Sequence, residues 1–355
     1  MERVKMADVA RAAGVSVATV SKVVNGRYGV SQATLAKVLT VIDDLEYVTS
    51  LGARSLRSHT TNVIGVLVAE FEPFSTELLK GVSDAINGRG YELLAFSGGH
   101  RDVSLGWERR SLSRLGGTLI DGAIIVTPTV PDAGRGIPVV AIDRHAGRSS
   151  VPTVDADNLG GAVLATEYLL GLGHRRIAHL AGRPDLESAR LREQGFRAAM
   201  AAAGIAVDES LVRNGGYRAE TATAPACELL TMAERPTAIL AGNDVSAIRT
   251  MEVARELGLR VPDDVSVVGF DNVPESALAI PALTTIDQPL RAMGATALDL
   301  LVRILQGQDL DATQVQLPTS MVERASCRAL RPQLVSAPRP GPPFAGEPDL
   351  VHGAL

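Results

Sequence analysis

The most constraining feature of this chain is the alternation of short apolar runs with longer amphipathic segments from residue 62 onward. The runs are rich in β-branched residues, which is typical of parallel strands that are buried on both faces by crossover helices. We predict strands at 63–69, 91–96, 123–127, 139–143, 176–181, 238–242 and 265–271, and helices at 76–89, 159–172, 187–203, 219–234, 245–257 and 290–305.

About 270 residues is long for one sheet of this kind, so we expect two α/β lobes within a body at 61–331. The segment 332–355 holds six prolines and three glycines in 24 residues. That composition cannot bury enough apolar surface to offset the entropy of ordering, and it predicts a disordered tail.

The apolar runs also limit where such a chain can reside. None approaches the roughly 18 residues that a membrane span needs. The first residues have no apolar core behind their charges, so we expect no secretory signal, no membrane partner and a cytoplasmic protein. Cys227 and Cys327 alone can form neither a zinc site nor a disulfide framework.

The net charge of −5 argues at first against a nucleic-acid partner, because phosphate binding requires positive charge. The charge is uneven, however. The first 60 residues hold eight basic and five acidic side chains, while the remaining 295 hold 27 basic and 35 acidic ones. This asymmetry indicates a basic module joined to an acidic body.

The first 48 residues read as a helix-turn-helix module. Apolar positions predict a helix over 6–13, ended by Gly14, and a second helix over 17–24 whose N-cap is Ser16. Ser31 caps a third helix over 32–45, whose expected inner stripe is Leu35, Val38, Leu39 and Ile42. Such a unit can present its second helix to the DNA major groove. A small helical cap on a larger domain is the alternative.

Residues 8–25, DVARAAGVSVATVSKVVN, resemble the DNA-binding head of the LacI/GalR transcription regulators. The resemblance implies base contacts from Val17, Ala18 and Lys22. It implies phosphate or positioning roles for Ser16, Thr19, Ser21, Asn25 and Ser31. Lys22 stands where the family usually has arginine, and lysine lacks the planar fork that contacts guanine through two bonds, so we expect softer discrimination at that base pair.

The segment 49–60 is similar to the family's hinge, which forms a short helix only on operator DNA. Its core, residues 50–57, has only eight residues and an internal Gly52, which is too few for a stable isolated helix, so ordering requires DNA and a partner copy. The resemblance implies that Ala53, Arg54 and Leu56 enter the minor groove, with Leu56 wedged into a base step. An ordinary linker leucine is the alternative.

Polar residues that directly follow the predicted strands are candidates for a binding site, because ligands of open α/β sheets lie at the carboxyl ends of strands and between lobes. Asp143, Asn243 and Asp271 each follow a strand, and Arg190 and Arg192 lie at the entry to a helix. Arginine, carboxylates and an amide together offer directional bonds to neighbouring hydroxyl groups, which suits a sugar.

The family resemblance supports the same site and adds to it. It implies a periplasmic-binding-protein-like body with two parallel sheets flanked by helices, with lobe 1 at about 61–157 and 288–317 and lobe 2 at about 158–287 and 318–331. Ser75 stands where many relatives have a second aromatic residue, which favours a sugar over a purine. The expected effector-binding residues are Phe74, Ser75, Asp143, Arg190, Arg192, Tyr217, Asn243, Asp271 and Gln288.

Enzyme activity is not expected. No G-x-G-x-x-G follows a strand, the six histidines show no metal-ligand spacing, and we expect no catalytic residue, metal or cofactor. From the family resemblance we expect a homodimeric, sugar-responsive repressor that binds a pseudo-palindromic operator. Segment 70–79 resembles actinobacterial members of the family. An activator, a regulator that needs a co-repressor, a sugar transport receptor and an enzyme on the same frame are the alternatives.

Overall fold

The computed structural model of the 355-residue chain describes residues 4–24, 29–45, 47, 60–98, 105–131, 136–145 and 150–330. The predicted hinge, apart from its last residue, and the predicted tail lie outside these residues, as does Asn25. Among the described residues, no helix is both long and apolar enough to cross a membrane.

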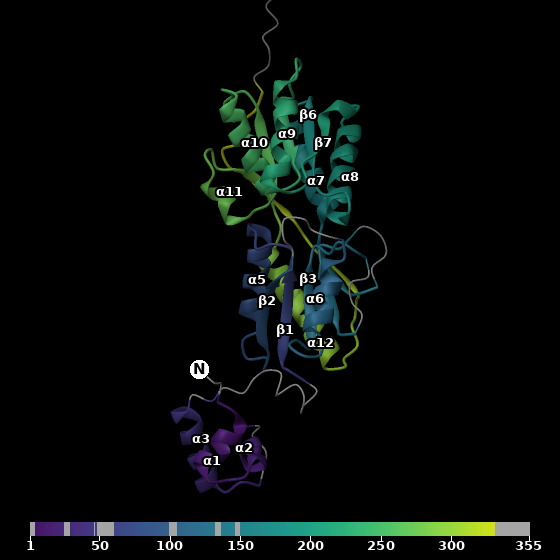
Figure 1. The fold of residues 1–355 in the computed structure, drawn as a ribbon. Helices are drawn as coiled ribbons and strands as arrows, with labels where there is room; N and C mark the ends of the chain where they lie inside the picture. Colours follow the sequence, from purple (N-terminus) through teal and green to yellow (C-terminus); the bar gives the residue numbers. More distant parts are fainter. Residues whose placement is uncertain are drawn as a thin grey trace, which may run out of the picture.

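The head consists of α1 (Met6–Ala13), α2 (Val17–Val24) and α3 (Gln32–Asp44), as the caps in the sequence predict (Figure 1). Gly14 ends α1 in the left-handed conformation at φ 63°, which glycine adopts without strain. The Ser31 hydroxyl accepts a hydrogen bond from the Thr34 amide at 3.2 Å at the start of α3. Local signals therefore set all three helices.

The predicted inner stripe of α3 is confirmed for Val38 and Ile42 and wrong for Leu35 and Leu39. Leu35 and Leu39 are 38% and 46% exposed, and Val38 is the fully buried residue of this helix. The side chains that pack with it into the head core are Val41, Ile42 and Leu45. The buried stripe of α3 therefore begins at Val38, and the residues before it are exposed or half-buried.

The body contains two six-stranded sheets, which confirms the predicted fold class. The lobe 1 sheet has the order β11-β5-β4-β3-β1-β2 and is parallel throughout. Its strands are β1 (Val63–Val68), β2 (Glu92–Ser97), β3 (Gly122–Val126), β4 (Val139–Ile142), β5 (Thr153–Ala156) and β11 (Gln314–Leu317).

The lobe 2 sheet has the order β12-β10-β9-β8-β6-β7, and β12 at its edge runs antiparallel to β10. The other strands pair in parallel. They are β6 (Ile177–Ala181), β7 (Val212–Asn214), β8 (Ala238–Ala241), β9 (Ser266–Asp271) and β10 (Thr284–Asp287), with β12 at Ser320–Val322. The antiparallel edge is a small departure from the predicted pair of parallel sheets.

Helices cover both faces of each sheet (Figure 1). In lobe 1, α5 (Pro73–Ala85) and α12 (Leu290–Leu305) pack on one face, and α6 (Trp107–Leu115) packs on the other. In lobe 2, α9 (Ala219–Thr231) and α10 (Asp244–Glu256) share one face, while α7 (Asn158–Gly171) and α8 (Glu187–Ala202) share the other. A short helix, α11 (Pro274–Leu278), follows β9.

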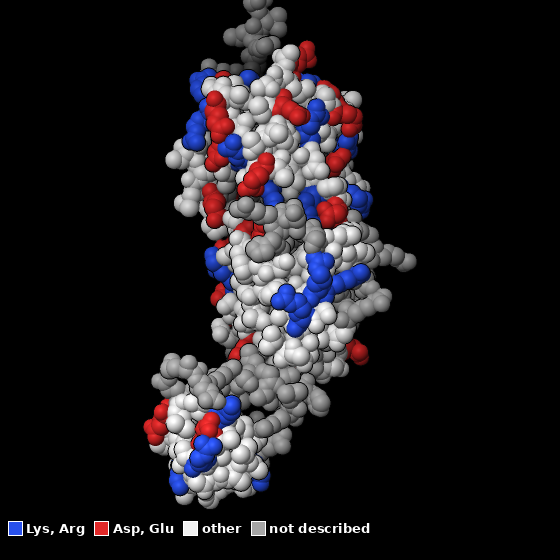
Figure 2. Space-filling view, in the orientation of Figure 1, with Lys and Arg blue, Asp and Glu red and all other residues white. Residues whose placement is uncertain are grey.

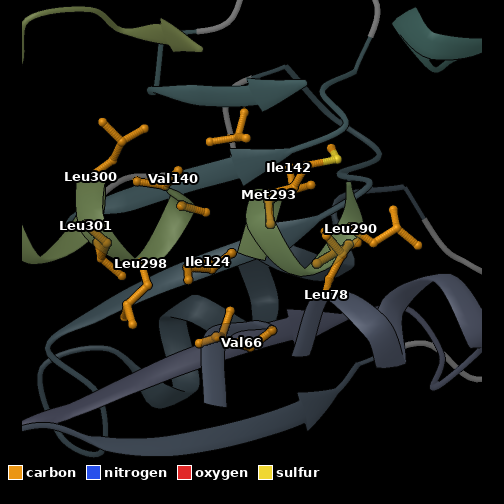
Figure 3. Packing of buried hydrophobic residues seen from close by; sticks show 14 of the residues in the cluster. Val66, Leu78, Ile124, Val140, Ile142, Leu290, Met293, Leu298, Leu300 and Leu301 are labelled. Carbon is orange, nitrogen blue, oxygen red and sulfur yellow. The ribbon is translucent and has the colours of Figure 1, made fainter. Parts of the chain in front are cut away.

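The two lobe 1 helices α5 and α12 cross at very short range. A Cβ atom added to Gly81 of α5 would lie 2.0 Å from the carbonyl oxygen of Arg291 in α12. Gly294 of α12 meets the carbonyl of Leu78 in the same way. This close crossing lets α12 insert Leu290, Met293, Leu298 and Leu301 against Val66, Ile124 and Val140 of the sheet (Figure 3).

The chain passes between the lobes three times. The crossings follow β5 at Asp157, follow β10 at Gln288, and join β11 to β12 through residues 318–319. Strand ends from both sheets meet at this junction, where Asp143 follows β4 and Asp271 ends β9. The fold thereby brings polar residues that are far apart in the sequence to one place.

Candidate ligand cleft and nucleic-acid interface

Helix α2 presents a polar and small-residue face to solvent. Val17, Ala18 and Lys22 are exposed, while Val20 and Val23 on the opposite side are buried in the head core. Thr19 and Ser21 are half-buried at the margins of the exposed face. The face is therefore accessible, as entry into a groove requires.

The serines that were expected to position the helix have local roles as well. The Ser16 hydroxyl accepts a hydrogen bond from the Thr19 amide at 3.1 Å at the start of α2, and Ser31 caps α3. Figure 2 shows basic and acidic side chains mixed on the visible face of the head, and Arg11 pairs with Asp8 at 3.2 Å. Asn25 and the hinge residues Ala53, Arg54 and Leu56 lie outside the described residues.

A narrow cleft of about 290 Å³ lies between the lobes. Each lobe contributes four of its lining residues. They are Glu72, Phe74, Thr127 and Asp143 from lobe 1, and Arg192, Tyr217, Asn243 and Asp271 from lobe 2. Six of these eight were predicted from the sequence, and the fold brings them together from six separate elements or loops.

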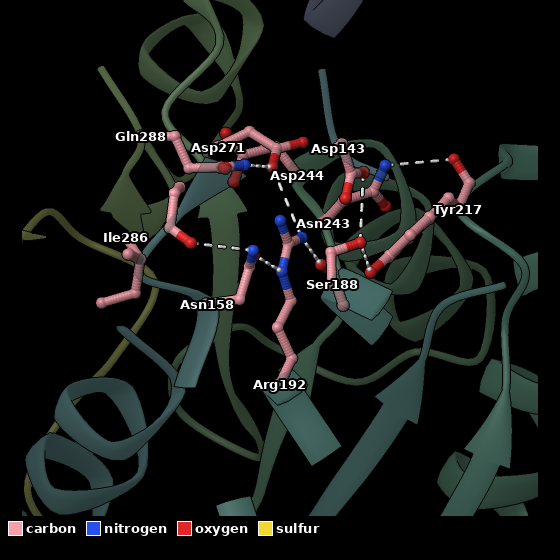
Figure 4. Close-up of polar contacts among 12 residues, drawn as sticks. Asp143, Asn158, Ser188, Arg192, Tyr217, Asn243, Asp244, Asp271, Ile286 and Gln288 are labelled. Carbon is pink, nitrogen blue, oxygen red and sulfur yellow. Dashed lines mark hydrogen bonds and ion pairs between the residues drawn. The ribbon is translucent and has the colours of Figure 1, made fainter. Parts of the chain in front are cut away.

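Arg192 is the cation of the cleft. It is 4% exposed, and its guanidinium lies 3.5 Å from Asp271. The guanidinium also donates to the side chain of Asn158 at 2.9 Å and to the carbonyl oxygen of Gly242 (Figure 4). Its carbon lies 3.8 Å from the centre of the Phe270 ring, so the arginine is fixed by stacking as well as by hydrogen bonds.

Asp143, on the lobe 1 wall of the cleft, offers a hydrogen-bond acceptor to a ligand. The Ser188 hydroxyl donates to one of its carboxylate oxygens at 3.1 Å. The second oxygen, Oδ1, is buried and has no hydrogen-bond partner among the described residues. Leaving a buried acceptor without a donor costs about 1–3 kcal/mol, so a ligand hydroxyl that donates to this oxygen would be favoured.

The backbone is strained around the cleft. Thr127, Asp143, Tyr217 and Asp271 all have positive φ angles, of 48°, 54°, 70° and 120°. Only two other non-glycine residues in the described part of the chain share this property, Asn62 and Asn272. Such conformations cost of order 1–3 kcal/mol each and concentrate at binding sites.

Burial raises the pKa values of the carboxyl groups in the cleft. It raises the pKa of Asp143 to about 6, although Arg192 acts in the opposite direction. It raises the pKa of Glu72 to about 7, with Arg218 lowering it in part. Burial also raises the pKa of Asp271, again against the influence of Arg192. The cleft thus holds more carboxylates than its single guanidinium can balance.

Three of the predicted residues do not line the cleft. Ser75 is buried, and its hydroxyl donates to the carbonyl oxygens of Glu70 and Glu72 at the start of α5. Arg190 is exposed, and its side chain pairs with Glu187 on the surface of α8. Gln288 is buried behind Asp271 and donates to its Oδ1, so it supports the wall of the cleft.

Two lining residues were missed. Thr127 directly follows β3, so the same rule that selected Asp143 could have selected it. Glu72 is the N-cap of α5 and precedes a proline, a position that predicts a helix start without indicating where the carboxylate points. Within the described residues, no group of three or more His, Cys, Asp and Glu side chains could hold a metal ion.

Comparison with protein-family models gives two matches. Residues 5–50 match the model described as "Bacterial regulatory proteins, lacI family". Residues 166–327 match the "Periplasmic binding protein-like domain". The first match covers the head helices, and the second covers most of lobe 2, from within α7, together with all of α12 and β11.

Two curated relatives match nearly full length. The HTH-type transcriptional repressor PurR of Photobacterium profundum is 33% identical over 331 residues, which covers 91% of this chain and 98% of the relative. The ribose operon repressor of Halalkalibacterium halodurans is 34% identical over 325 residues, which covers 90% of this chain and 96% of the relative.

Two solved structures are similar over most of the chain. One is the lac repressor dimer bound to operator and the anti-inducer ONPF, with a TM-score of 0.79 and 30% identity, covering 92% of this chain and 100% of the other. The second is a complex of the transcriptional regulator CelR with cellobiose, with a TM-score of 0.68 and 32% identity, covering 91% of this chain and 100% of the other.

Proposed function

Because this chain belongs to the LacI family of bacterial regulatory proteins, we propose that it represses sugar-catabolism genes and leaves its operator when a sugar binds between the lobes. The observation that carries the proposal is that one chain joins the exposed face of α2 to a polar cleft between two lobes. Two of its relatives support it, since one is named a ribose operon repressor and the transcriptional regulator CelR is solved as a complex with cellobiose.

On the DNA side, the proposal assigns base contacts to Val17, Ala18 and Lys22 of α2. Ser16, Thr19, Ser21, Asn25 and Ser31 hold the head on the phosphate backbone, and Ala53, Arg54 and Leu56 enter the minor groove from the hinge. The functional unit is a cytoplasmic homodimer whose two heads read a pseudo-palindrome, because one head with a small excess of positive charge binds phosphate only weakly. No catalytic step is part of this function.

On the sugar side, Arg192 and Asp271 bind one edge of the ligand and Asp143 accepts a hydroxyl from the opposite wall. Tyr217 and Phe74 contact its apolar faces, and Asn243 contributes its amide. A ligand that moves such a switch from 1:99 to 99:1 must favour one state by about 5.5 kcal/mol. Contacts from both lobes to one ligand can supply that difference only when the cleft is closed.

The proposal is tested by operator selection followed by sugar titration. Duplexes selected from a random library with the full-length protein should share a pseudo-palindrome, and at least one neutral mono- or oligosaccharide should release the labelled operator in fluorescence anisotropy. A sugar that tightens operator binding would show co-repression. Failure to select any DNA would overturn the regulatory function.

Replacing Leu56 with alanine should weaken operator binding by about tenfold or more and reduce DNA bending, since an apolar wedge no longer props open the central base step. Anisotropy and a gel-based bending assay measure the two effects. Sugar affinity, measured by calorimetry, should stay unchanged. Operator affinity equal to that of the wild type would contradict the wedge role of Leu56.

Replacing Gly182 with alanine should weaken sugar binding by about tenfold, because the new Cβ would lie 2.0 Å from Cζ of Tyr217 and would displace this ring. Tyr217 cannot simply relax, since its backbone is left-handed and its carbonyl accepts from Asn243 at 3.1 Å. Calorimetry measures the affinity, and unchanged operator binding serves as the control for folding. Wild-type sugar affinity in this variant would argue against Tyr217 as a contact.

A further inference from the structure

The two walls of the cleft differ in charge. The lobe 1 wall contributes two carboxylates, Glu72 and Asp143, and no cation lines the cleft on this side among the described residues. The lobe 2 wall contributes one cation and one carboxylate, Arg192 and Asp271, which face each other at 3.5 Å. The negative charge that is not balanced within the cleft therefore lies on lobe 1.

Arg192 compensates the lobe 1 wall only in part, since its bonds are made within lobe 2. It lowers the pKa of Asp143, but burial outweighs it and raises that pKa to about 6. Its guanidinium is bound to Asp271 and Asn158 (Figure 4) and to the carbonyl of Gly242. It also stacks on the ring of Phe270. A planar group held at so many points cannot turn towards the opposite wall without breaking buried hydrogen bonds. Its charge is largely neutralised before a ligand arrives.

The arginines near Glu72 are committed as well. Arg218 and Arg183 are the cations that lower the pKa of Glu72. Arg218 pairs with Glu70 at 3.1 Å, and Arg183 pairs with Asp185 at 2.6 Å. Burial nevertheless dominates and raises the pKa of Glu72 to about 7. The local arginines thus leave the Glu72 charge incompletely compensated.

Asp143, the residue after β4, adds a second carboxylate to the lobe 1 wall. Its Oδ1 atom is buried without a hydrogen-bond partner among the described residues. The negative charge of Asp143 also raises the pKa of Glu72, because two carboxylates on one wall disfavour each other's ionised form. A ligand that donates hydrogen bonds relieves this wall. A ligand that brings a third negative charge to this wall meets the buried carboxylate of Asp143 and the half-buried carboxylate of Glu72, both of the same sign.

We propose that the lobe 1 wall excludes acidic ligands, and that Glu72 determines this selectivity by accepting a hydrogen bond from a hydroxyl or ammonium group and repelling carboxylates and phosphates. The effector is then an uncharged or amino sugar, and uronic acids and sugar phosphates do not act. This inference rests on the proposed function, because it takes the cleft to be the sugar site.

The test uses sugars that differ only in charge. Calorimetry with the full-length protein would compare D-glucose, D-glucuronamide and D-glucuronate, the galactose series, D-ribose with its 5-phosphate, and cellobiose. Because an amide and a carboxylate are nearly equal in size, the uronamide separates charge from bulk. We expect every sugar that binds to be neutral or cationic, and its acidic counterpart to bind at least tenfold more weakly.

Glu72→Gln, which keeps the shape of the side chain and removes its charge, should reduce the preference for the uronamide over the uronate by tenfold or more. Glu70→Gln is the matched control. It removes the same charge two residues away, from a glutamate that pairs with Arg218 and does not line the cleft. An equal loss of selectivity in Glu70→Gln would show a diffuse charge effect and would overturn the role of Glu72.

The outcomes separate this inference from the function on which it rests. An acidic sugar that binds the wild-type protein as tightly as its neutral counterpart overturns the inference and leaves a sugar-responsive repressor in place. If none of the sugars binds, the proposed sugar site fails and the inference fails with it. If Glu72→Gln keeps the preference for neutral sugars, another part of the cleft excludes acidic ligands, and the inference about Glu72 is overturned as well.

Discussion

Replacing Arg192 with alanine is expected to abolish sugar-induced release of the operator while operator binding without sugar stays close to that of the wild type. Hydrogen bonds to a buried charged group contribute about 1.5–3 kcal/mol each. Two such bonds to a ligand correspond to a loss of affinity of about 100-fold or more. The same change leaves Asp271 buried without its cation, so the lobe 2 wall loses its charge balance as well.

Anisotropy of a labelled operator during sugar titration measures this effect. Arg190→Ala is the matched control, because Arg190 lies two residues away on α8 and pairs with Glu187 at the surface. That variant should respond to sugar like the wild type. If the Arg192→Ala protein leaves the operator at the same sugar concentration as the wild type, Arg192 is not the anchor of the sugar. If Arg190→Ala no longer responds to sugar, the cleft extends further than described.

Replacing Gly81 with alanine should lower the free energy of unfolding of lobe 1 by about 2 kcal/mol or more. The added methyl group would meet the backbone of Arg291 at 2.0 Å from its carbonyl oxygen, so α5 and α12 must move apart. Overpacking costs about 1–3 kcal/mol, with the upper end expected where backbone is the obstacle. The higher helix propensity of alanine returns up to about 1 kcal/mol, which is not enough to offset it.

Urea denaturation followed by circular dichroism measures the loss. Gly171→Ala is the control, because Gly171 ends α7 and has nothing within 4 Å of its added Cβ. That variant should be as stable as the wild type or slightly more stable. A Gly81→Ala protein that unfolds at the wild-type urea concentration would mean that the two helices can separate at no cost.

The elements that could be predicted best are those set by a few neighbouring residues. Gly14 ends α1, Ser16 starts α2 and Ser31 starts α3, and each acts through a hydrogen bond or a φ angle within three or four positions. The rotation of α3 could not be predicted in this way. It depends on where the other two helices of the head contact α3, and in the structure Val38 is buried while Leu35 and Leu39 are exposed.

Short strands were missed for a related reason. Strand β11 reads Gln-Val-Gln-Leu, a pattern too short and too polar to predict a strand. It forms because it pairs with β5, whose residues lie about 160 positions earlier in the chain. The same pairing supports β5, which contains Asp155. Such elements are set by partners that a local pattern cannot reveal.

The cleft residues also divide into those that a local pattern can predict and those that depend on the rest of the fold. The rule that polar residues follow strands selected Asp143, Asn243 and Asp271, all of which line the cleft. Arg190 and Arg192 could not be separated. The helix over 187–203 was predicted with the correct start, and two positions on a helix point about 200° apart, but the pattern did not show which of the two faces the other lobe. The fold turns Arg192 inward, and it leaves Arg190 at the surface.

The late position of α12 and β11 in the chain has a consequence for synthesis on the ribosome. When residue 287 has emerged, lobe 2 has its five parallel strands and the helices that cover them. Lobe 1 still lacks β11 and the helix that buries Val66, Ile124 and Val140. Lobe 1 is begun first, but α12 and β11 complete it only after the five parallel strands of lobe 2 have emerged, and β12 then adds the antiparallel edge of lobe 2. Nascent chains would expose part of the apolar face of lobe 1 until α12 arrives, which departs from the usual order in which the N-terminal unit is completed first.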